Sequence, residues 1–100
     1  MNVSIVIPTF NRKPILIKCL HALENQKLNK LIDSYEIIVV DDGSKDGTTE
    51  WIKENKRNLP HVVLYEQEHG GPALGRNLGI SKASGEIIIG NYRTTQEQFV

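Results

Sequence analysis

The sequence is poor in cysteine and has no long apolar run. Cys19 is its only cysteine, which excludes an internal disulfide and a multi-cysteine zinc cluster. No apolar run approaches the roughly 20 residues that a membrane-spanning helix needs. The first four residues, Met-Asn-Val-Ser, lack the basic segment of a secretory signal. These absences predict a cytoplasmic chain without a membrane span.

Net charge is also missing. Twelve Lys and Arg residues balance twelve Asp and Glu residues, so no overall field draws the chain toward nucleic acid or an anionic membrane. Apolar residues make up 39% of the chain and charged residues 24%, which is ordinary usage for a globular domain. We therefore expect one folded domain that recognises its partner at a local site and does not bind nucleic acid.

Four short apolar runs rich in β-branched residues predict strands over residues 3–8, 35–40, 62–65 and 86–89. Nearly continuous apolar strands are typical of a parallel sheet buried on both faces, and segments with helical patterns separate them. The sequence therefore predicts an α/β fold, with a Rossmann-like parallel sheet of about four strands and helices on both faces. The domain is expected to cover residues 1–89, followed by a polar tail over residues 90–100.

Three helices are expected between these strands. Spacings of three and four residues predict that one face of the first helix is formed by Leu16, Cys19, Leu20 and Leu23. The second helix carries Trp51, and its candidate N-caps are Ser44, Asp46 and Thr48. The third helix runs from about Pro72 to Ala83, with Gly85 as its C-terminal stop.

Small residues at spacings of four leave one side of the third helix bare; they are Gly71, Gly75, Gly79 and Ala83. An interior glycine costs roughly 1 kcal/mol relative to alanine, so two of them on one face indicate a close approach. The approaching group is either the sheet or a ligand. Packing on the sheet is the interpretation we prefer.

Ligands of open parallel sheets bind beyond the carboxyl ends of the strands, where the strand order reverses. The loops expected there cover residues 8–12, 41–48 and 90–93. Asp41 and Asp42 end a buried strand, and the pattern fits both turn formers and carboxylates that face a ligand. Phe10 fits either the core or a flat face for a nucleobase, with the core as the default. Arg76 fits either a solvated side chain or a phosphate contact near a helix N-terminus.

Three motifs occur in order along the chain: SIVIPTFNR (residues 4–12), EIIVVDDGSKDGT (residues 36–48) and GGPALGRNLGISKASGEIII (residues 70–89). Together they resemble glycosyltransferase family 2, the inverting enzymes with the GT-A fold. The resemblance runs from about Val3 to Ile89, and three ordered motifs are far more specific than any one of them.

The resemblance implies a site for a nucleotide-diphosphate sugar donor. The residues at the matching positions are, in chain order, Pro8, Thr9, Phe10, Asn11, Arg12, Asp41, Asp42, Arg76 and Asn77. The first five look like the loop that contacts the base. Asp42 looks like the carboxylate that reads the base edge, with Asp41 supporting the same pocket. Arg76 and Asn77 look like the helix motif that flanks the donor.

The sequence departs from the family after the fourth strand. Complete members carry an Asp-x-Asp type motif there, which binds Mg²⁺ or Mn²⁺, whereas this chain reads Gly90-Asn91-Tyr92-Arg93 and has no aspartate after Asp46. No residue can be assigned as the general base that deprotonates the acceptor. We therefore expect a truncated or divergent family member that binds the donor, holds no metal or other cofactor as it stands, and is catalytically incomplete alone.

A non-catalytic nucleotide-binding or regulatory module would carry the same motifs. Such a module could form a homodimer that covers the open edge of its sheet. A phospho-receiver domain fits poorly, because its acidic pair follows the first strand and here the pair follows the second. A dinucleotide site fits worse, because no G-x-G-x-x-G follows the first strand.

Overall fold

A computed structural model describes residues 1–26, 30–68 and 70–89. Its elements, in chain order, are β1 (Asn2–Thr9), α1 (Lys13–Glu24), β2 (Ser34–Asp41), α2 (Thr48–Glu54), the 3-10 helix η1 (Lys56–Asn58), β3 (Val62–Glu66), α3 (Pro72–Lys82) and β4 (Ile87–Ile89). The alternation of strands and helices confirms the predicted α/β class. Within the described ranges, no helix is long and apolar enough to span a membrane.

The four strands form one parallel sheet in the order β3-β2-β1-β4. β1 pairs with β2 along its whole length, from Asn2 opposite Ser34 to Thr9 opposite Asp41. On its other side β1 pairs with β4, where Val3 lies opposite Ile87. Because the strand order reverses at β1, the carboxyl end of β1 lies at the position where open parallel sheets bind ligands.

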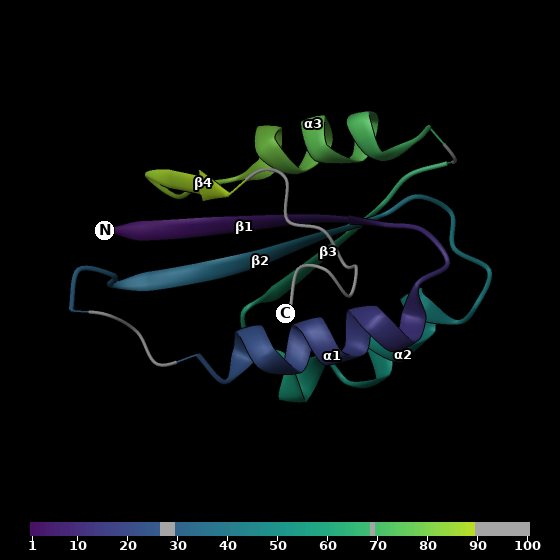
Figure 1. The fold of residues 1–100 in the computed structure, drawn as a ribbon, viewed down its shortest axis with the longest axis horizontal. Helices are drawn as coiled ribbons and strands as arrows, with labels where there is room; N and C mark the ends of the chain where they lie inside the picture. The colour runs from purple at the N-terminus through teal and green to yellow at the C-terminus, as the bar shows by residue number, and fades with distance from the viewer. Residues whose placement is uncertain (27–29, 69, 90–100) are drawn as a thin grey trace.

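Helices cover both faces of the sheet, as the sequence predicts. Figure 1 shows α1 and α2 on one side of the sheet and α3 on the other. Successive side chains of a strand point to opposite faces. Ile5 and Ile7 of β1 therefore join the core beneath α1, whereas Val6 joins a second, smaller cluster beneath α3.

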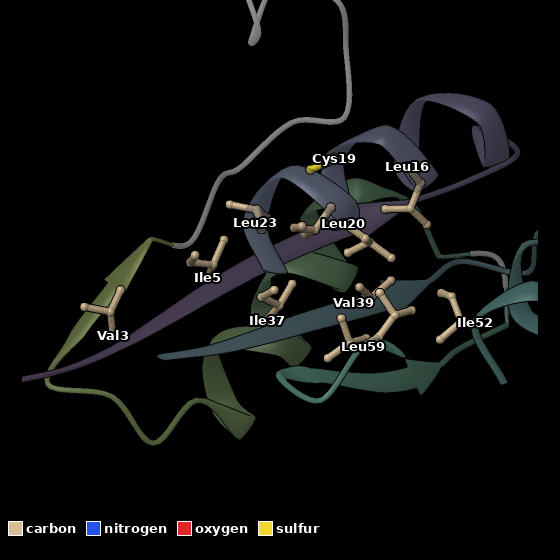
Figure 2. Close-up of a cluster of buried hydrophobic side chains, with 12 residues drawn as sticks. Val3, Ile5, Leu16, Cys19, Leu20, Leu23, Ile37, Val39, Ile52 and Leu59 are labelled. Atoms are coloured by element: carbon tan, nitrogen blue, oxygen red, sulfur yellow. The ribbon is translucent and has the colours of Figure 1, made fainter. Parts of the chain in front are cut away.

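The larger core lies between the sheet and α1, α2 and η1. Figure 2 shows α1 placing Leu16, Cys19, Leu20 and Leu23 against the strands, with Ile52 of α2 and Leu59 beside them. The four α1 residues are the ones whose spacing predicts an apolar face, and all of them are buried. This face holds the larger of the two clusters of buried apolar side chains.

The glycines of α3 bring its backbone close to the sheet. A Cβ atom on Gly79 would lie 2.2 Å from Val6 Cγ1, and one on Gly75 would lie 3.2 Å from Pro8 Cβ. Both glycines are buried. The preferred interpretation of the glycine spacing, packing on the sheet, is therefore confirmed.

Two details of the helix ends differ from the sequence expectation. α3 ends at Lys82 because Ala83 already has an extended backbone. Gly85 is not its C-terminal stop: a Cβ there would lie 2.7 Å from the backbone nitrogen of Ser4, so this glycine allows the chain to approach β1. These contacts position β4 beside β1.

The N-cap position of α2 is also different from the three candidates. It is Gly47, with φ of 88°, and it makes no side-chain cap. Thr48 is already the first residue of the helix, and Asp46 accepts a hydrogen bond from its backbone N–H at 3.2 Å. Ser44 bonds instead to the loop after β1. Three polar residues close together made the cap ambiguous, and the left-handed conformation favours the glycine.

Candidate functional site

The loops after β1 and β2 are joined by reciprocal hydrogen bonds at the carboxyl edge of the sheet. The backbone N–H of Asn11 donates to Ser44 Oγ at 2.9 Å, and the N–H of Lys45 donates to Asn11 Oδ1 at 2.8 Å. The N–H of Lys13 donates to Asp46 Oδ2 at 2.9 Å. Two of the three predicted loops, residues 8–12 and 41–48, therefore form one surface.

Asn11 has a left-handed backbone conformation, with φ of 51°. Asparagine tolerates this conformation better than most residues do. The bend turns the chain out of β1 and lets the Asn11 side chain reach the second loop. Asn11 therefore connects the loop after β1 to the loop after β2.

Asp41 and Asp42 point to opposite sides of the sheet. Asp41 accepts hydrogen bonds from Ser44 N–H at 3.2 Å and from Thr49 Oγ1 of α2. Its contact with Ser44 is a turn hydrogen bond, which supports the turn-former interpretation for this residue. Because neighbouring residues alternate between faces, the two carboxylates serve different surroundings.

The Asp42 carboxylate is buried on the α3 side, where three donors approach it. Oδ1 accepts from Gln67 Nε2 at 2.8 Å and from Gly70 N–H at 2.7 Å, and Oδ2 accepts from Gly71 N–H at 3.0 Å. These bonds tie the carboxyl end of β2 to the chain that enters α3. A carboxylate bonded to backbone N–H groups at a helix start is a favourable arrangement, because the helix dipole places positive charge there.

Thr9 ends β1 between these loops, and its side chain is only 4% exposed. Its Oγ1 has no hydrogen-bond partner within the described part of the chain. Its backbone oxygen accepts from Asp42 N–H at 2.9 Å. A buried hydroxyl without a partner costs about 1–3 kcal/mol, and such groups are candidates for completion by a ligand or a water molecule.

Phe10 is 42% exposed at this edge, so the core interpretation of this residue is wrong. The left-handed Asn11 follows it directly and turns the chain away from the core. Pro8 is half-buried beneath α3, and Arg12 is exposed at the start of α1. The predicted base-contacting loop therefore presents an aromatic ring and a guanidinium group at the surface.

Arg76 and Asn77 lie within α3, half-buried and exposed respectively. Asp42 connects their helix to the other loops through its hydrogen bonds to Gly70 and Gly71. The third predicted loop, residues 90–93, lies outside the described residues. The structure therefore links two predicted loops directly and joins α3 to them through the Asp42 carboxylate.

Hydrogen bonds within the loop after β2 favour the charged form of the Asp46 carboxyl. Burial alone would raise the pKa of Asp46, but hydrogen bonds from the Thr48 hydroxyl and from the backbone N–H groups of Lys13 and Thr48 hold it below its ordinary value. The loop that carries Asp46 thus keeps a negative charge that faces the start of α1.

Asp41 and Asp42 do not share a site for a divalent cation, because their carboxylates bond to opposite sides of the sheet. Asp41 and Asp42 are both occupied by protein donors. Among the described residues, no group of three or more His, Cys, Asp or Glu side chains could hold a metal ion. The two aspartates therefore hold the loops and α3 together, and they do not form a set of metal ligands.

Sequence reasoning missed Gln67 and Thr49, which hold the two aspartates. Gln67 directly follows β3, so the rule that led to the loops after β1 and β2 also applies to it. Thr49 lies in the first turn of α2, and its hydroxyl reaches back to the strand end. Applying the same rule to the loop after β3 would have identified Gln67 as a candidate.

The fold and these loops define an α/β domain whose candidate ligand site lies at the carboxyl edge of its sheet. The family model described as glycosyl transferase family 2 matches residues 4–90. The chain belongs to this family. Its three sequence motifs lie within the matched range, and the resemblance expected from them is confirmed.

Relatives and solved structures agree with this membership. The chain is 40% identical to a poly(ribitol-phosphate) β-glucosyltransferase of Bacillus spizizenii over 89% of its own length and 14% of the relative's. It is 38% identical to the glycosyltransferase AglE of Haloferax volcanii, over 86% of its own length and 28% of the relative's. The chain thus spans less than a third of either curated relative.

Two solved glycosyltransferases share the fold. The crystal structure of Staphylococcus aureus TarS 1–349 superposes with a TM-score of 0.78 at 29% identity, over 94% of this chain and 27% of that one. The mannosyltransferase PcManGT of Pyrobaculum calidifontis, in complex with GDP-Man and Mn²⁺, gives a TM-score of 0.75 at 29% identity, over 86% and 25% of the two chains. TarS 1–349 is also known in complex with UDP-GlcNAc, with a TM-score of 0.75 and 30% identity, over 88% and 25% of the two chains.

Proposed function

We propose that this chain binds the nucleoside diphosphate part of a sugar nucleotide at the carboxyl edge of its sheet, as the donor-binding domain of a glycosyltransferase. Residues 8–12 contact the base and Asp42 reads its edge, with Asp41 supporting the pocket. Arg76 and Asn77 flank the diphosphate. Two similar proteins support this substrate class: TarS 1–349 forms a complex with UDP-GlcNAc, and PcManGT forms one with GDP-Man.

One observation carries this proposal: the hydrogen bonds between Asn11, Ser44 and Lys45, which unite the loops after β1 and β2. They bring the exposed Phe10 ring and the strand end at Asp42 to the same edge of the sheet. Aromatic rings and a few fixed polar groups are what a nucleobase site needs. The unpartnered Thr9 hydroxyl at this edge adds a polar group that a ligand can complete.

We further propose that the 100 residues alone do not transfer sugar. Transfer needs a base for the acceptor hydroxyl and stabilisation of the charge on the leaving diphosphate. Asp41 and Asp42, which end β2 at this edge, accept hydrogen bonds from protein donors. Donor binding without transfer is the expected behaviour, and turnover of a sugar nucleotide by the purified chain above a no-protein control would contradict it.

Calorimetric titration with UDP and with GDP tests the binding proposal. We expect weak saturable binding of at least one nucleotide, and about a tenfold loss on Phe10→Ala, because stacking of one base on an aromatic ring contributes roughly 1–3 kcal/mol. Phe10 is exposed, so this substitution leaves the core intact.

Ile80→Ala is the matched control. Ile80 is 39% exposed on α3, close to the 42% of Phe10, and it lies toward the far end of that helix. It should bind the nucleotide as the wild-type chain does. Absence of binding of either nucleotide at millimolar concentration would refute the proposed function, and equal affinities of Phe10→Ala and wild type would remove Phe10 from the site.

A further inference from the structure

Gln67 contacts the carboxylate that joins the site to α3. Its side-chain Nε2 donates to Asp42 Oδ1 at 2.8 Å. An ionised carboxylate only accepts hydrogen bonds, so the amide must present its nitrogen to Asp42. The same oxygen accepts from Gly70 N–H at 2.7 Å. Oδ1 is therefore fixed by two donors that approach from the chain between β3 and α3.

The backbone and surroundings of Gln67 hold its side chain in place. Its N–H donates to Asp41 O at 2.9 Å, which extends the pairing of β3 with β2 by one residue. Its Nε2 would lie 3.6 Å from a Cβ on Gly75, so the side chain lies against the bare face of α3. A donor confined in this way restricts the rotation of the carboxylate that it bonds.

We infer that Gln67 is a positioning residue for nucleotide binding, acting through Asp42. This inference rests on the proposed function, in which Asp42 accepts from the edge of the base. Gln67 and the Gly70 and Gly71 amides fix the plane of the carboxylate. Hydrogen bonds to a base are directional. Loss of the Gln67 donor therefore weakens recognition of the base while leaving the contacts of the diphosphate unchanged.

Two variants test the inference, with UDP and inorganic pyrophosphate as the probes. Gln67→Met keeps the length of the side chain and removes the donor, and should bind UDP roughly tenfold more weakly with unchanged affinity for pyrophosphate. A merely structural defect would weaken both ligands. Gln26→Met is the matched control, because Gln26 is an exposed glutamine that follows α1 at the opposite edge of the sheet.

Gln67→Glu supplies a signature that a packing role cannot produce. When ionised, its carboxylate repels Asp42 and cannot donate; when protonated, it can donate to Asp42 as the amide does. UDP affinity of Gln67→Glu should therefore recover toward the wild-type value as the pH falls from about 8 to about 5. An unchanged ratio of variant to wild-type affinity across this range would overturn the inference.

Amide hydrogen exchange separates this inference from the proposed function. The Gly70 and Gly71 amides should exchange faster in Gln67→Met than in wild type, because the carboxylate that accepts from them is free to rotate. If wild type binds neither nucleotide, the proposed function fails, and unchanged exchange would then also refute a positioning role for Gln67. If wild type binds UDP and Gln67→Met binds it equally well, the inference alone fails.

Discussion

The two faces of the sheet are covered by different kinds of side chains. Beneath α1 and α2 lies a continuous core of aliphatic side chains, including Leu20 and Ile37. Beneath α3, the buried apolar cluster of the described residues is smaller and consists of Val6, Ile38 and Val40. That smaller cluster has polar contacts at both of its ends: Ser4 and Glu36 at the amino edge of the strands, and Asp42 with its donors at the carboxyl edge.

This difference separates stability from recognition. Apolar burial stabilises a domain in proportion to the area removed from water, so the α1 face dominates folding. The α3 face relies on glycines for a close approach and on hydrogen bonds for its geometry. Hydrogen bonds are directional and fix orientation, which is what a binding edge requires. Substitutions on the two faces should therefore have different consequences.

The largest expected effect is the loss of a core side chain beneath α1. Leu20→Ala should lower the free energy of unfolding by about 2–5 kcal/mol, because Leu20 is fully buried and the cavity left behind adds to the lost transfer energy. Leu78→Ala is its counterpart on α3, where the side chain is only partly buried. Urea unfolding of both variants measures the difference, and equal losses would contradict the comparison.

Gly79→Ala tests the close approach on the α3 face. The new Cβ would lie 2.2 Å from Val6 Cγ1, and overpacking of this kind costs about 1–3 kcal/mol. Gly75→Ala should cost less, since its closest contact would be 3.2 Å and alanine favours the helix by up to about 1 kcal/mol. Thermal unfolding should rank Gly79→Ala below Gly75→Ala; the reverse order would show that α3 moves away from the sheet at little cost.

Glu36 gives the α3 face a dependence on pH. Burial alone would raise the pKa of Glu36, but hydrogen bonds from Ser4 and from the backbone and hydroxyl of Ser84 hold it below its ordinary value of 4.5. A carboxyl with a lowered pKa stabilises the fold above its unfolded pKa and loses that contribution as the pH falls through its folded pKa.

Glu36→Gln should therefore cost about 1 kcal/mol at neutral pH, and the gap between variant and wild type should close as the pH falls below 4.5. Denaturant unfolding at a series of pH values from about 7 to 3 measures this gap. A gap that stays constant through this range would exclude Glu36 as a source of acid sensitivity.

Thr9→Val should have the smallest effect on stability and the opposite sign. Valine has nearly the shape of threonine and removes the buried hydroxyl that has no partner within the described residues, so stability should stay equal or rise by up to about 1 kcal/mol. If a nucleotide completes this hydroxyl, the same variant should bind UDP more weakly. Destabilisation by Thr9→Val would show that another group satisfies the hydroxyl.

Much of the fold could be predicted from the sequence because its periodicities are clear. The β-branched runs placed all four strands, and the spacing of Leu16, Cys19, Leu20 and Leu23 identified the buried face of α1. Gly85 could not be interpreted from local sequence, because its role depends on contact with Ser4 near the other end of the chain. A local sequence pattern cannot predict a contact between residues that are far apart in the chain.

The sequence predicted which loops form the candidate site, but not which partners their side chains bond to. The rule for parallel sheets brought residues 8–12 and 41–48 together, as their hydrogen bonds confirm. The opposite orientations of Asp41 and Asp42 follow from strand alternation, yet their partners, Thr49 and Gln67, required the packed structure. Whether the predicted residues contact a ligand stays a prediction.

The central place of β1 has a consequence for how the chain is made. β1 is synthesised before the other three strands of the sheet, and its neighbour β4 is the last of the four. Pairings between distant segments form slowly, because the entropy of closing the long loop is lost before the contacts form. β1 therefore has an unpaired edge until β4 has left the ribosome. Exposed strand edges are templates for aggregation, so chaperone protection during this interval would favour correct folding.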